Sequence, residues 1–375
     1  MKLTPEQYVG RKIEELETPA LVVDLERLEN NLQLMTDYCR EHDIALWPHT
    51  KTHKCIEIAE LQIECGAAGL TVAKSEEAEI MAQSGAERIL VGYPIYGVEK
   101  WTRLATLAGD LELSVAVDSI QTAEGLSAAA KKAGTTIDLL IDLDVGLNRT
   151  GVSTPEAAAQ LAAQAGELPG LQLRGLFFYP GHIWNPPEKQ DAELKAVSAK
   201  IQETLELFDK KGLRRDRVSG GSTPAAMTSH RIFGQTETRP GTYLFQDRNY
   251  WGLGLCREED CALTVLTTVI STSVAGRAML DAGSKTFSGD GWLSGNQLGS
   301  GWIKDRSPEW DFDMMSEEHG HVFLKEGAKA PVVGEKVQVI PNHVCPCVNL
   351  HEYYFGARNG IVETVFYTDG RGRSR

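Results

Sequence analysis

The segment Leu46-Trp47-Pro48-His49-Thr50-Lys51-Thr52-His53-Lys54-Cys55 joins the end of an apolar strand to a dense group of basic and hydroxyl side chains. The apolar residues begin at Ile44, and Pro48 ends the strand because proline has no N–H to donate to a sheet. In a barrel or an open α/β sheet, this junction is the carboxyl end of a strand, where active sites are built. Nearby cations and partial burial lower the pKa of a lysine there, so Lys51 is a candidate nucleophile. The alternative interpretation is a basic loop on a solvated face.

Strand and helix patterns alternate from this segment onward. Strands are expected over 44–47, 69–73, 88–92, 111–117, 137–144, 171–179, 217–219 and 242–245. Helices are expected over 55–65, 75–84, 98–107, 119–133, 154–166, 187–211 and 223–230. Near-continuous apolar runs such as Leu139-Leu140-Ile141 are typical of strands that are covered on both faces. Eight such units predict an α/β fold with a (β/α)₈ TIM-type barrel, and a doubly wound sheet is the alternative.

The pattern changes after about residue 250. Short β-branched or apolar runs at 262–271, 278–281, 321–324, 336–340 and 360–367 are separated by glycine and polar loops. Long helical patterns are absent from this region, which therefore predicts a C-terminal β domain. A further strand over Ala20–Asp24 could join either part of the protein. We expect the barrel to occupy residues 25–248 and the β domain to comprise residues 1–24 plus 249–375.

Composition narrows the class of protein. A chain of 375 residues is long enough for two domains. Its net charge of −14 argues against a nucleic-acid partner. No apolar run is long enough to cross a bilayer, and the first residues lack a signal-peptide pattern, so no membrane partner is expected. The seven cysteines are an odd number scattered through the chain, which favours reduced thiols and a cytoplasmic location.

Further polar clusters follow the expected strands. Arg149 follows the fifth and could hold an anionic oxygen, although a loop salt bridge would explain it too. The turn Tyr179-Pro180-Gly181-His182 follows the sixth, and its alternative is an ordinary turn with an aromatic lid. The segment Ser219-Gly220-Gly221-Ser222-Thr223-Pro224 follows the seventh and could bind phosphate through backbone N–H groups and hydroxyls. A plain helix cap is its alternative. Arg239-Pro240-Gly241-Thr242-Tyr243 could complete such a site.

The expected β domain contains the pair His343 and Cys345. On an extended segment these two side chains point the same way, because side chains repeat every two residues. Imidazole and thiolate together are a zinc-type donor set, and two protein ligands leave positions for water and substrate. Taken alone, the pair is more safely interpreted as a structural one, with a buried cysteine beside a histidine whose ring nitrogens are hydrogen-bonded within the protein. Cys347 would share this face only if the strand continued through Pro346.

In combination and in this order, these motifs resemble one family. The motifs are Pro48–Lys54, Asp144-Val145-Gly146 with Arg149, Tyr179 with Gly181-His182, Ser219–Pro224, Arg239–Tyr243, Asp281-Ala282-Gly283-Ser284-Lys285, and the His343–Cys345 pair. The chain resembles the D-threonine aldolase/eukaryotic-type D-serine dehydratase family, in the alanine-racemase-like class of pyridoxal 5'-phosphate (PLP) enzymes. The resemblance covers nearly the whole chain. It implies a PLP-binding barrel, a C-terminal β domain, a homodimer and a small D-amino acid as substrate.

The resemblance also implies roles for individual residues. Lys51 would form the Schiff base with PLP, and Arg149 and Tyr179 would contact the ring side of the cofactor. The phosphate would be surrounded by Gly221, Ser222, Thr223, Gly241 and Tyr243. His343 and Cys345 would hold a divalent metal, with zinc the first choice and Mn or Mg the alternatives. One position departs from the family pattern, because Trp47 stands where many relatives have arginine.

The reaction that the resemblance implies is lysis of a D-β-hydroxy amino acid. By the family pattern, dehydratases have the motif His-X-Cys at the metal pair, and aldolases have His-X-Asp. Cys345 therefore favours a D-serine/D-threonine-type dehydratase that gives a 2-oxo acid and ammonia. The alternatives are retro-aldol cleavage to glycine and an aldehyde, and an amino-acid racemase. Two further interpretations are a PLP-carrying protein made of the barrel alone and a metal enzyme without PLP. The first would have no need of the β domain, and the second would give no role to the basic segment around Lys51.

Overall fold

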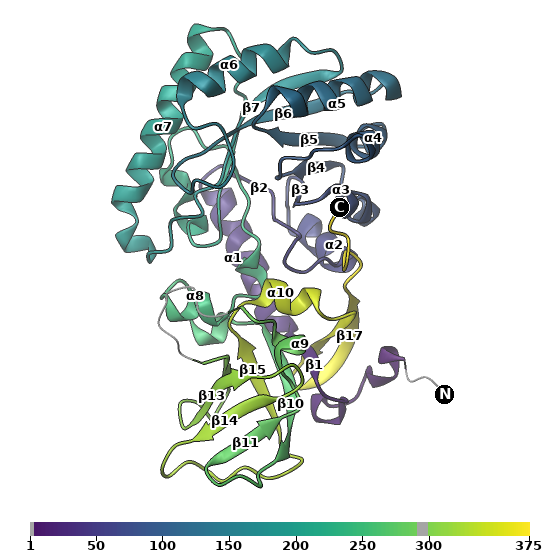
Figure 1. Ribbon diagram of the computed structural model, residues 1–375, viewed down its shortest axis with the longest axis vertical. Helices are drawn as coiled ribbons and strands as arrows, with labels where there is room; N and C mark the ends of the chain where they lie inside the picture. Colours follow the sequence, from purple (N-terminus) through teal and green to yellow (C-terminus); the bar gives the residue numbers. More distant parts are fainter. Residues whose placement is uncertain (1–3, 291–298) are drawn as a thin grey trace. The chain divides into compact units, whose positions relative to one another are not determined.

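The computed structural model describes residues 4–290 and 299–375, which form two compact units (Figure 1). One unit comprises Gln33–Gly241 together with Gly372–Arg375. The other comprises the residues up to Leu32 together with Thr242–Arg371. The helix α1 (Leu25–Glu41) contains the boundary at Leu32, so its residues contribute to both units.

The first unit is built on an eight-stranded parallel sheet. Its strands are β2 (Ala45–Leu46), β3 (Leu70–Val72), β4 (Arg88–Val91), β5 (Glu112–Val117), β6 (Ile137–Leu143), β7 (Leu171–Phe178), β8 (Arg217–Gly220) and β9 (Glu237–Thr238). They lie in the order β2-β9-β8-β7-β6-β5-β4-β3. A parallel bridge between His49 and Thr71 joins the two ends of this order. The predicted α/β barrel with eight strands is therefore confirmed.

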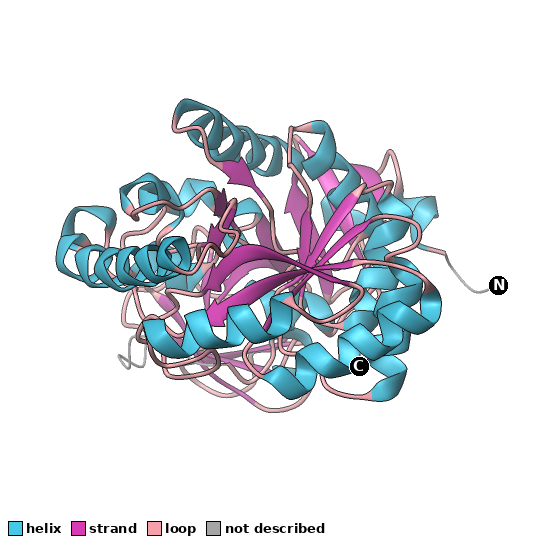
Figure 2. Cartoon of the chain, turned by 90° about the horizontal axis from the view of Figure 1, so that it is seen from above, coloured by secondary structure: helices cyan, strands magenta, loops and turns pink. Residues whose placement is uncertain are grey.

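Helices cover the outside of this sheet. They are α2 (Ile56–Glu64), α3 (Ser75–Met81), α4 (Val98–Leu107), α5 (Ile120–Ala133), α6 (Pro155–Gly166) and α7 (Asp191–Lys210). Seen from above, they surround the strands (Figure 2). Local sequence fixes their starts: Ser119 caps α5 by accepting the Thr122 N–H, and Thr154 caps α6 ahead of Pro155. A large core of buried aliphatic residues lies between the helices and the strands.

Trp47 fills the interior of the barrel. Its indole is 3% exposed and packs in a cluster with Leu90, Ala116, Leu140 and Phe177. The Arg217 guanidinium lies 4.4 Å from the centre of the Trp47 ring and forms an ion pair with Glu237. The tryptophan that departs from the family pattern therefore serves as the packing surface for a buried arginine.

The prediction of the eighth strand over 242–245 is wrong. The eighth strand is β9, and Thr242–Leu244 forms the 3₁₀ helix η6. β9 has only two residues, both polar, and the Glu237 carboxylate is paired with Arg217 in the barrel interior. An apolar pattern could not have marked it. The helix expected over 223–230 is a 3₁₀ helix, η5 (Ala226–Arg231).

The second unit contains a nine-stranded sheet. Its strands are β1 (Ala20–Asp24), β10 (Leu263–Ser271), β11 (Arg277–Leu280), β12 (Gly301–Ile303), β13 (Trp310–Met315), β14 (Gly320–Leu324), β15 (Lys336–Pro341), β16 (Tyr353–Arg358) and β17 (Ile361–Tyr367). The order β13-β14-β11-β10-β1-β16-β17 forms the main path, and β15 joins β10 to β12. This confirms the C-terminal β-rich region, although β12, β13 and β16 were not predicted.

The strand β1 belongs to this second sheet and lies inside it. β1 pairs antiparallel with β10 and parallel with β16. Just before it, the Thr18 hydroxyl donates to Asp281 Oδ2 at 2.6 Å. The other oxygen of Asp281 accepts hydrogen bonds from the Thr267 hydroxyl and the Thr268 N–H. Asp281, the first residue of one family motif, therefore fastens the early segment to the sheet.

The remaining helical elements are short. The α-helices are α8 (Arg248–Gly252), α9 (Ser284–Phe287) and α10 (Val344–Asn349). The other 3₁₀ helices are η1 (Pro5–Tyr8), η2 (Ile13–Glu15), η3 (Ala82–Ser84), η4 (Pro187–Lys189) and η7 (Glu258–Asp260). Within the described ranges, no helix has the length and apolar character needed to cross a membrane. All seven cysteines are free thiols.

Candidate active site and metal pair

Lys51 and Lys54 lie close together in the sequence, but their amines have different environments. Lys54 Nζ lies 3.0 Å from Glu77 Oε1. Glu77 is nearly fully buried and also accepts the N–H groups of Ala73 and Lys74. The Lys54 amine is thus engaged in a largely buried ion pair. In the described part of the chain, no ion pair or hydrogen bond engages the Lys51 amine. Of these two lysines, Lys51 is the one available to react with a carbonyl.

Two histidines flank Lys51 in the sequence, of which His53 is fully buried and His49 is half-buried. Burial, reinforced by the positive charges of Lys51 and Arg239, holds the pKa of His49 well below its usual value. Burial lowers the pKa of His53 to about 4. The Cys55 N–H donates to His53 Nδ1 at 3.1 Å, so this nitrogen carries no proton. Both imidazoles are therefore neutral at pH 7.

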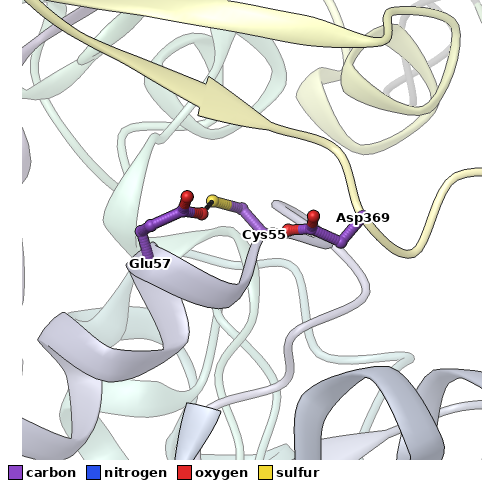
Figure 3. A group of neighbouring side chains, drawn as sticks. All are labelled: Cys55, Glu57 and Asp369. Atoms are coloured by element: carbon purple, nitrogen blue, oxygen red, sulfur yellow. Dashed lines mark hydrogen bonds between the residues drawn. The ribbon is translucent and has the colours of Figure 1, made fainter. Parts of the chain in front are cut away.

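Cys55 ends the segment at the start of α2. It is fully buried, and its Sγ donates a hydrogen bond to Glu57 Oε2 at 3.0 Å (Figure 3). Both residues belong to the barrel unit, and the contact spans the first turn of the helix. The thiol therefore helps to fix the point where the lysine segment becomes helical.

Arg149 and Tyr179 come together at the carboxyl ends of β6 and β7. The Arg149 guanidinium carbon lies 4.6 Å from the centre of the Tyr179 ring. Close by in the same loop, Gly146 packs against the His182 imidazole, where a Cβ would lie 3.1 Å from a ring carbon. These contacts place the predicted pair side by side. The aromatic ring and the guanidinium can contact a planar, anionic ligand from one side.

The two predicted phosphate-binding loops also lie together. The Gly241 N–H donates to Thr223 Oγ1 at 3.2 Å. A Cβ on Gly221 would lie 2.4 Å from Thr238 Oγ1, and one on Gly241 would lie 3.0 Å from Thr52 Oγ1. Glycine is thus required at position 221, where the two backbones approach each other, and Gly241 packs tightly against Thr52.

The same loops contain a hydroxyl suited to a ligand. Ser222 is buried, and its Oγ has no hydrogen-bond partner among the residues described. A buried hydroxyl without a partner is costly unless a ligand or water satisfies it. This hydroxyl, the two close glycines and the Lys51 amine fit a phosphate-bearing aldehyde such as PLP.

Arg239 connects the loops, a role that the sequence motif did not reveal. Its Nη1 donates to Ser219 Oγ and its Nη2 to the Phe178 carbonyl, both at 2.7 Å. Burial lowers the pKa of this guanidinium to about 9, which leaves it charged at pH 7. The two residues that Arg239 contacts each lie just before a predicted cofactor contact: Phe178 before Tyr179, and Ser219 before the Gly220-Gly221 loop. Arg239 itself lies two residues before Gly241. One cation therefore ties together the strand ends that carry the predicted cofactor contacts.

The predicted metal pair lies in the β unit, in a conformation that differs from the expectation. The expected extended segment through Cys345 is wrong, because only His343 is extended and Cys345 lies in the first turn of α10. Even so, the His343 and Cys345 side chains are within hydrogen-bonding reach of each other. Thr242 Oγ1 lies 3.6 Å from Cys345 Sγ. Imidazole and thiol are thus juxtaposed, and this donor set fits a zinc-type ion.

Two further groups define this second site. Asp247 is fully buried, which raises its pKa to about 6, and it accepts the N–H groups of Tyr250 and Val344. It therefore fixes the start of α10, where the pair lies. Cys347 is excluded from the pair because its buried Sγ contacts the Thr286 carbonyl at 3.3 Å and burial raises its pKa.

The predicted residues are divided between the two units. The barrel unit contains Lys51, Arg149, Tyr179, Gly221, Ser222, Thr223 and Gly241. The β unit contains Tyr243, His343 and Cys345. Tyr243 lies in η6 and is buried. No motif had indicated Asp247 or the carboxylate of Asp290 beside His343. Arg239 lies in a predicted motif, but the motif did not show that its guanidinium joins the loops.

Comparison with known proteins identifies the two parts. Residues 23–249 match the family described as alanine racemase, N-terminal domain, and residues 262–357 match the putative serine dehydratase domain. The D-threonine aldolase of an Arthrobacter species is 34% identical over 100% of this chain and 97% of its own length. The D-threo-3-hydroxyaspartate dehydratase of a Delftia species is 30% identical over 93% and 96%.

Solved structures extend this result. The crystal structure of D-threonine aldolase from Filomicrobium marinum superposes with a TM-score of 0.90 at 30% identity, covering 98% of this chain and 99% of the other. A cysteine-to-alanine variant of a D-threo-3-hydroxyaspartate dehydratase, with a TM-score of 0.86 and 28% identity over 95% of this chain and 98% of the other, is described as the metal-free form. The family implies PLP, which the barrel residues fit. The chain belongs to the D-threonine aldolase/D-serine dehydratase family of PLP-dependent lyases.

Proposed function

We propose that this protein cleaves the Cα–Cβ bond of D-β-hydroxy amino acids, giving glycine or a related amino acid and an aldehyde. The observation that carries this proposal is the full-length match to D-threonine aldolase at 34% identity. The sequence motif at the metal pair favoured a dehydratase instead. The dehydratase match is also nearly full length but lower, at 30%. We therefore place aldol cleavage first.

The barrel residues would bind and orient the cofactor. PLP, when bound, supplies an electron sink for the bonds to the substrate's α-carbon. Lys51 would hold the cofactor through its amine, and the ion pair with Glu77 would keep the neighbouring Lys54 amine out of the reaction. Gly221, Ser222, Thr223 and Gly241 would contact the phosphate. Tyr243 is proposed as a further phosphate contact on the strength of the family pattern.

Arg149 and Tyr179 would hold the ring side of the cofactor. Their contact at 4.6 Å keeps the guanidinium against an aromatic face and limits its movement. Arg239 would keep the three loop ends in register through its bonds to Ser219 and Phe178. Precise loop placement matters because small displacements of a bound substrate cost much of the rate.

The β unit would supply a divalent metal. His343 and Cys345 would be its protein ligands, and a bound ion polarises oxygen as a Lewis acid. Thiolate is a soft ligand, so zinc is the first choice, with Mn or Mg as alternatives. The metal-free description of a relative's structure supports a metal in the family but does not name the ion.

Dehydration remains the second candidate because of Cys345. In that reaction the β-hydroxyl leaves, and the products are a 2-oxo acid and ammonia. The same lysine and the same metal pair could serve either reaction, since both break a bond at or beside the α-carbon. Membership of a lyase family argues against the racemase.

The test is a product panel with the purified, PLP-loaded protein. D-threonine, D-3-hydroxyaspartate and D-serine would each be assayed for aldehyde or glyoxylate, glycine, 2-oxo acid and ammonia, with the L-enantiomers as controls. We expect glycine and acetaldehyde in equal amounts from D-threonine. A 2-oxo acid with ammonia as the main products would place the dehydratase first. Cys345→Asp should shift the metal preference towards harder ions such as Mn²⁺.

We also propose a homodimer and a cytoplasmic location. The homodimer rests on the family resemblance, and light scattering after gel filtration would test it. The cytoplasmic location rests on the seven free thiols, which are typical of a reducing compartment. Detection of the protein by cell fractionation would test this second proposal.

A further inference from the structure

The His343 ring is held on two sides. Its Nδ1 lies 2.8 Å from Asp290 Oδ2, which is a hydrogen-bonding distance. The ring also lies within hydrogen-bonding reach of the Cys345 side chain. His343 is partly exposed, with 30% of its side chain accessible, and Asp290 is more exposed at 53%. The three side chains therefore form a short chain from carboxylate to imidazole to thiol.

We propose that Asp290 is a positioning residue that holds His343 Nδ1, so that Nε2 faces the divalent metal proposed above. This inference rests on the proposed function, which supplies the metal. A neutral histidine has one N–H and one lone pair. When Nδ1 donates its proton to Asp290, the lone pair is on Nε2. A histidine that binds a metal commonly donates its other N–H to a carboxylate, which fixes the ring and raises its basicity.

Asp290 is placed to act through His343 rather than as a ligand. Nδ1 and Nε2 point away from each other across the ring. An ion bound about 2.1 Å from Nε2 would lie roughly 6 Å from the Asp290 oxygen, too far for coordination. The hydrogen bond therefore separates the two roles, with the carboxylate on one side of the ring and the metal position on the other.

The other acidic group near His343 is already engaged. Asp247 lies in the buried interior, and its two oxygens accept the N–H groups of Tyr250 and Val344. Its hydrogen bonds fix the backbone at the start of α10 instead of the imidazole. Asp290 is thus the carboxylate in contact with a ring nitrogen. An exposed contact between charged groups adds little to the stability of a protein. The contact between Asp290 and His343 would therefore serve to orient the His343 ring.

The experiment compares metal affinity across matched variants of the full-length, PLP-loaded protein. Wild type, Asp290→Asn, Asp290→Ala and Asp290→Glu would be stripped of metal and titrated with Zn²⁺ and with Mn²⁺ in competition with a chelating dye. Asp313→Asn is the control, since Asp313 lies exposed on β13 in the same unit and loses the same charge. The PLP absorbance and the unfolding midpoint of each variant would be recorded to confirm an intact fold.

We expect the Asp290→Ala variant to bind metal about 10–100-fold more weakly, as for other outer carboxylates. Asp290→Asn should lose less, since its amide oxygen can still accept the N–H, and Asp290→Glu should recover part of the affinity. The control should match wild type. Nitrogen chemical shifts of His343 in the metal-free protein, recorded at a pH high enough for the imidazole to be neutral, provide a second readout, and we expect the single proton on Nδ1.

Two results would overturn different statements. If wild type binds the ion and Asp290→Ala binds it equally well, Asp290 does not position His343. If His343 carries its proton on Nε2 in the neutral, metal-free protein, the proposed orientation is also wrong. If wild type takes up neither Zn²⁺ nor Mn²⁺, the metal assignment under the proposed function fails first, and this inference fails with it.

Discussion

Replacement of Gly221 by alanine would show how much the phosphate cradle depends on close backbone approach. Gly221 has φ +107°, and an added Cβ would lie 2.4 Å from Thr238 Oγ1 and 2.8 Å from the Arg239 nitrogen. The side-chain oxygen could turn aside, but the backbone nitrogen cannot. The substitution must therefore displace β9, and with it the Gly241 loop that donates to Thr223.

The magnitude has two parts. A non-glycine residue in this backbone region costs about 1–2 kcal/mol. Forcing an extra carbon into a filled space costs about 1–3 kcal/mol more. The lower backbone entropy of the unfolded alanine chain returns roughly 0.4–1 kcal/mol. We therefore expect a loss of about 2–4 kcal/mol in the free energy of unfolding.

The assay is urea unfolding of the PLP-free protein, followed by measurement of PLP affinity. Gly212→Ala is the matched control, since Gly212 also has a positive φ, of +66°, but has no atom within 4 Å of the Cβ position. The control should lose about 1 kcal/mol, which isolates the backbone term. PLP affinity should fall about 10–100-fold in Gly221→Ala, since one charged hydrogen bond is worth about 1.5–3 kcal/mol. It should not change in the control.

Equal losses in the two variants would contradict this reasoning. They would mean that the space around Gly221 accommodates a methyl group and that only the backbone conformation matters. Unchanged PLP affinity in a destabilised Gly221→Ala variant would place the phosphate elsewhere in the barrel.

Three further predictions concern single side chains. Lys51→Ala should abolish the visible absorbance of lysine-bound PLP, whereas Lys54→Ala should retain it; peptide mapping after borohydride reduction that finds PLP on Lys54 would reverse the assignment. Arg239→Met should weaken PLP binding and Arg239→Lys should restore it only in part, because lysine cannot reach Ser219 and Phe178 with two separate N–H groups; full retention of PLP by the methionine variant would show that the loops hold without the guanidinium. Because the folded-state pKa of His53 is depressed, its stabilising contribution is present above about pH 6.5 and is lost as the pH falls towards 4, with a slope of about 1.4 kcal/mol per pH unit. The difference in unfolding free energy between wild type and His53→Asn should therefore shrink from pH 7.5 to pH 5, and a constant difference would refute the depressed pKa.

Much of the fold could be predicted because its elements carry strong periodic patterns. Strands such as β6, buried along its whole length, and helices such as α5, with a serine cap, follow directly from local sequence. β9 could not be found this way, because both of its residues are polar and Glu237 is buried in an ion pair with Arg217 on the neighbouring strand β8. β13 was not predicted, although the alternation of apolar and charged residues over Trp310, Asp311 and Phe312 is typical of a half-buried strand.

The candidate site was predictable where neighbours in sequence are neighbours in space. Lys51, the Gly221 loop and the metal pair all came from short motifs. Arg239 and Asp290 act through contacts with residues far away in the chain, so no local pattern could show their roles. The start of α10 at Val344 was missed because the His343–Cys345 spacing suggests a strand, and the hydrogen bond from Val344 to Asp247 is a long-range contact.

The central place of β1 has a consequence for synthesis and folding. The Thr18 side chain just before β1 can contact Asp281 only when that residue, 263 positions later, has been made. β1 likewise cannot pair until β10 and, later still, β16 have been made. Such distant partners make the second sheet slow to complete, since loop closure precedes the stabilising contacts. During translation, β1 would remain an unpaired apolar strand while the barrel is made. A fragment limited to residues 262–357 would expose the edges of β10 and β16 and would be prone to edge-to-edge association.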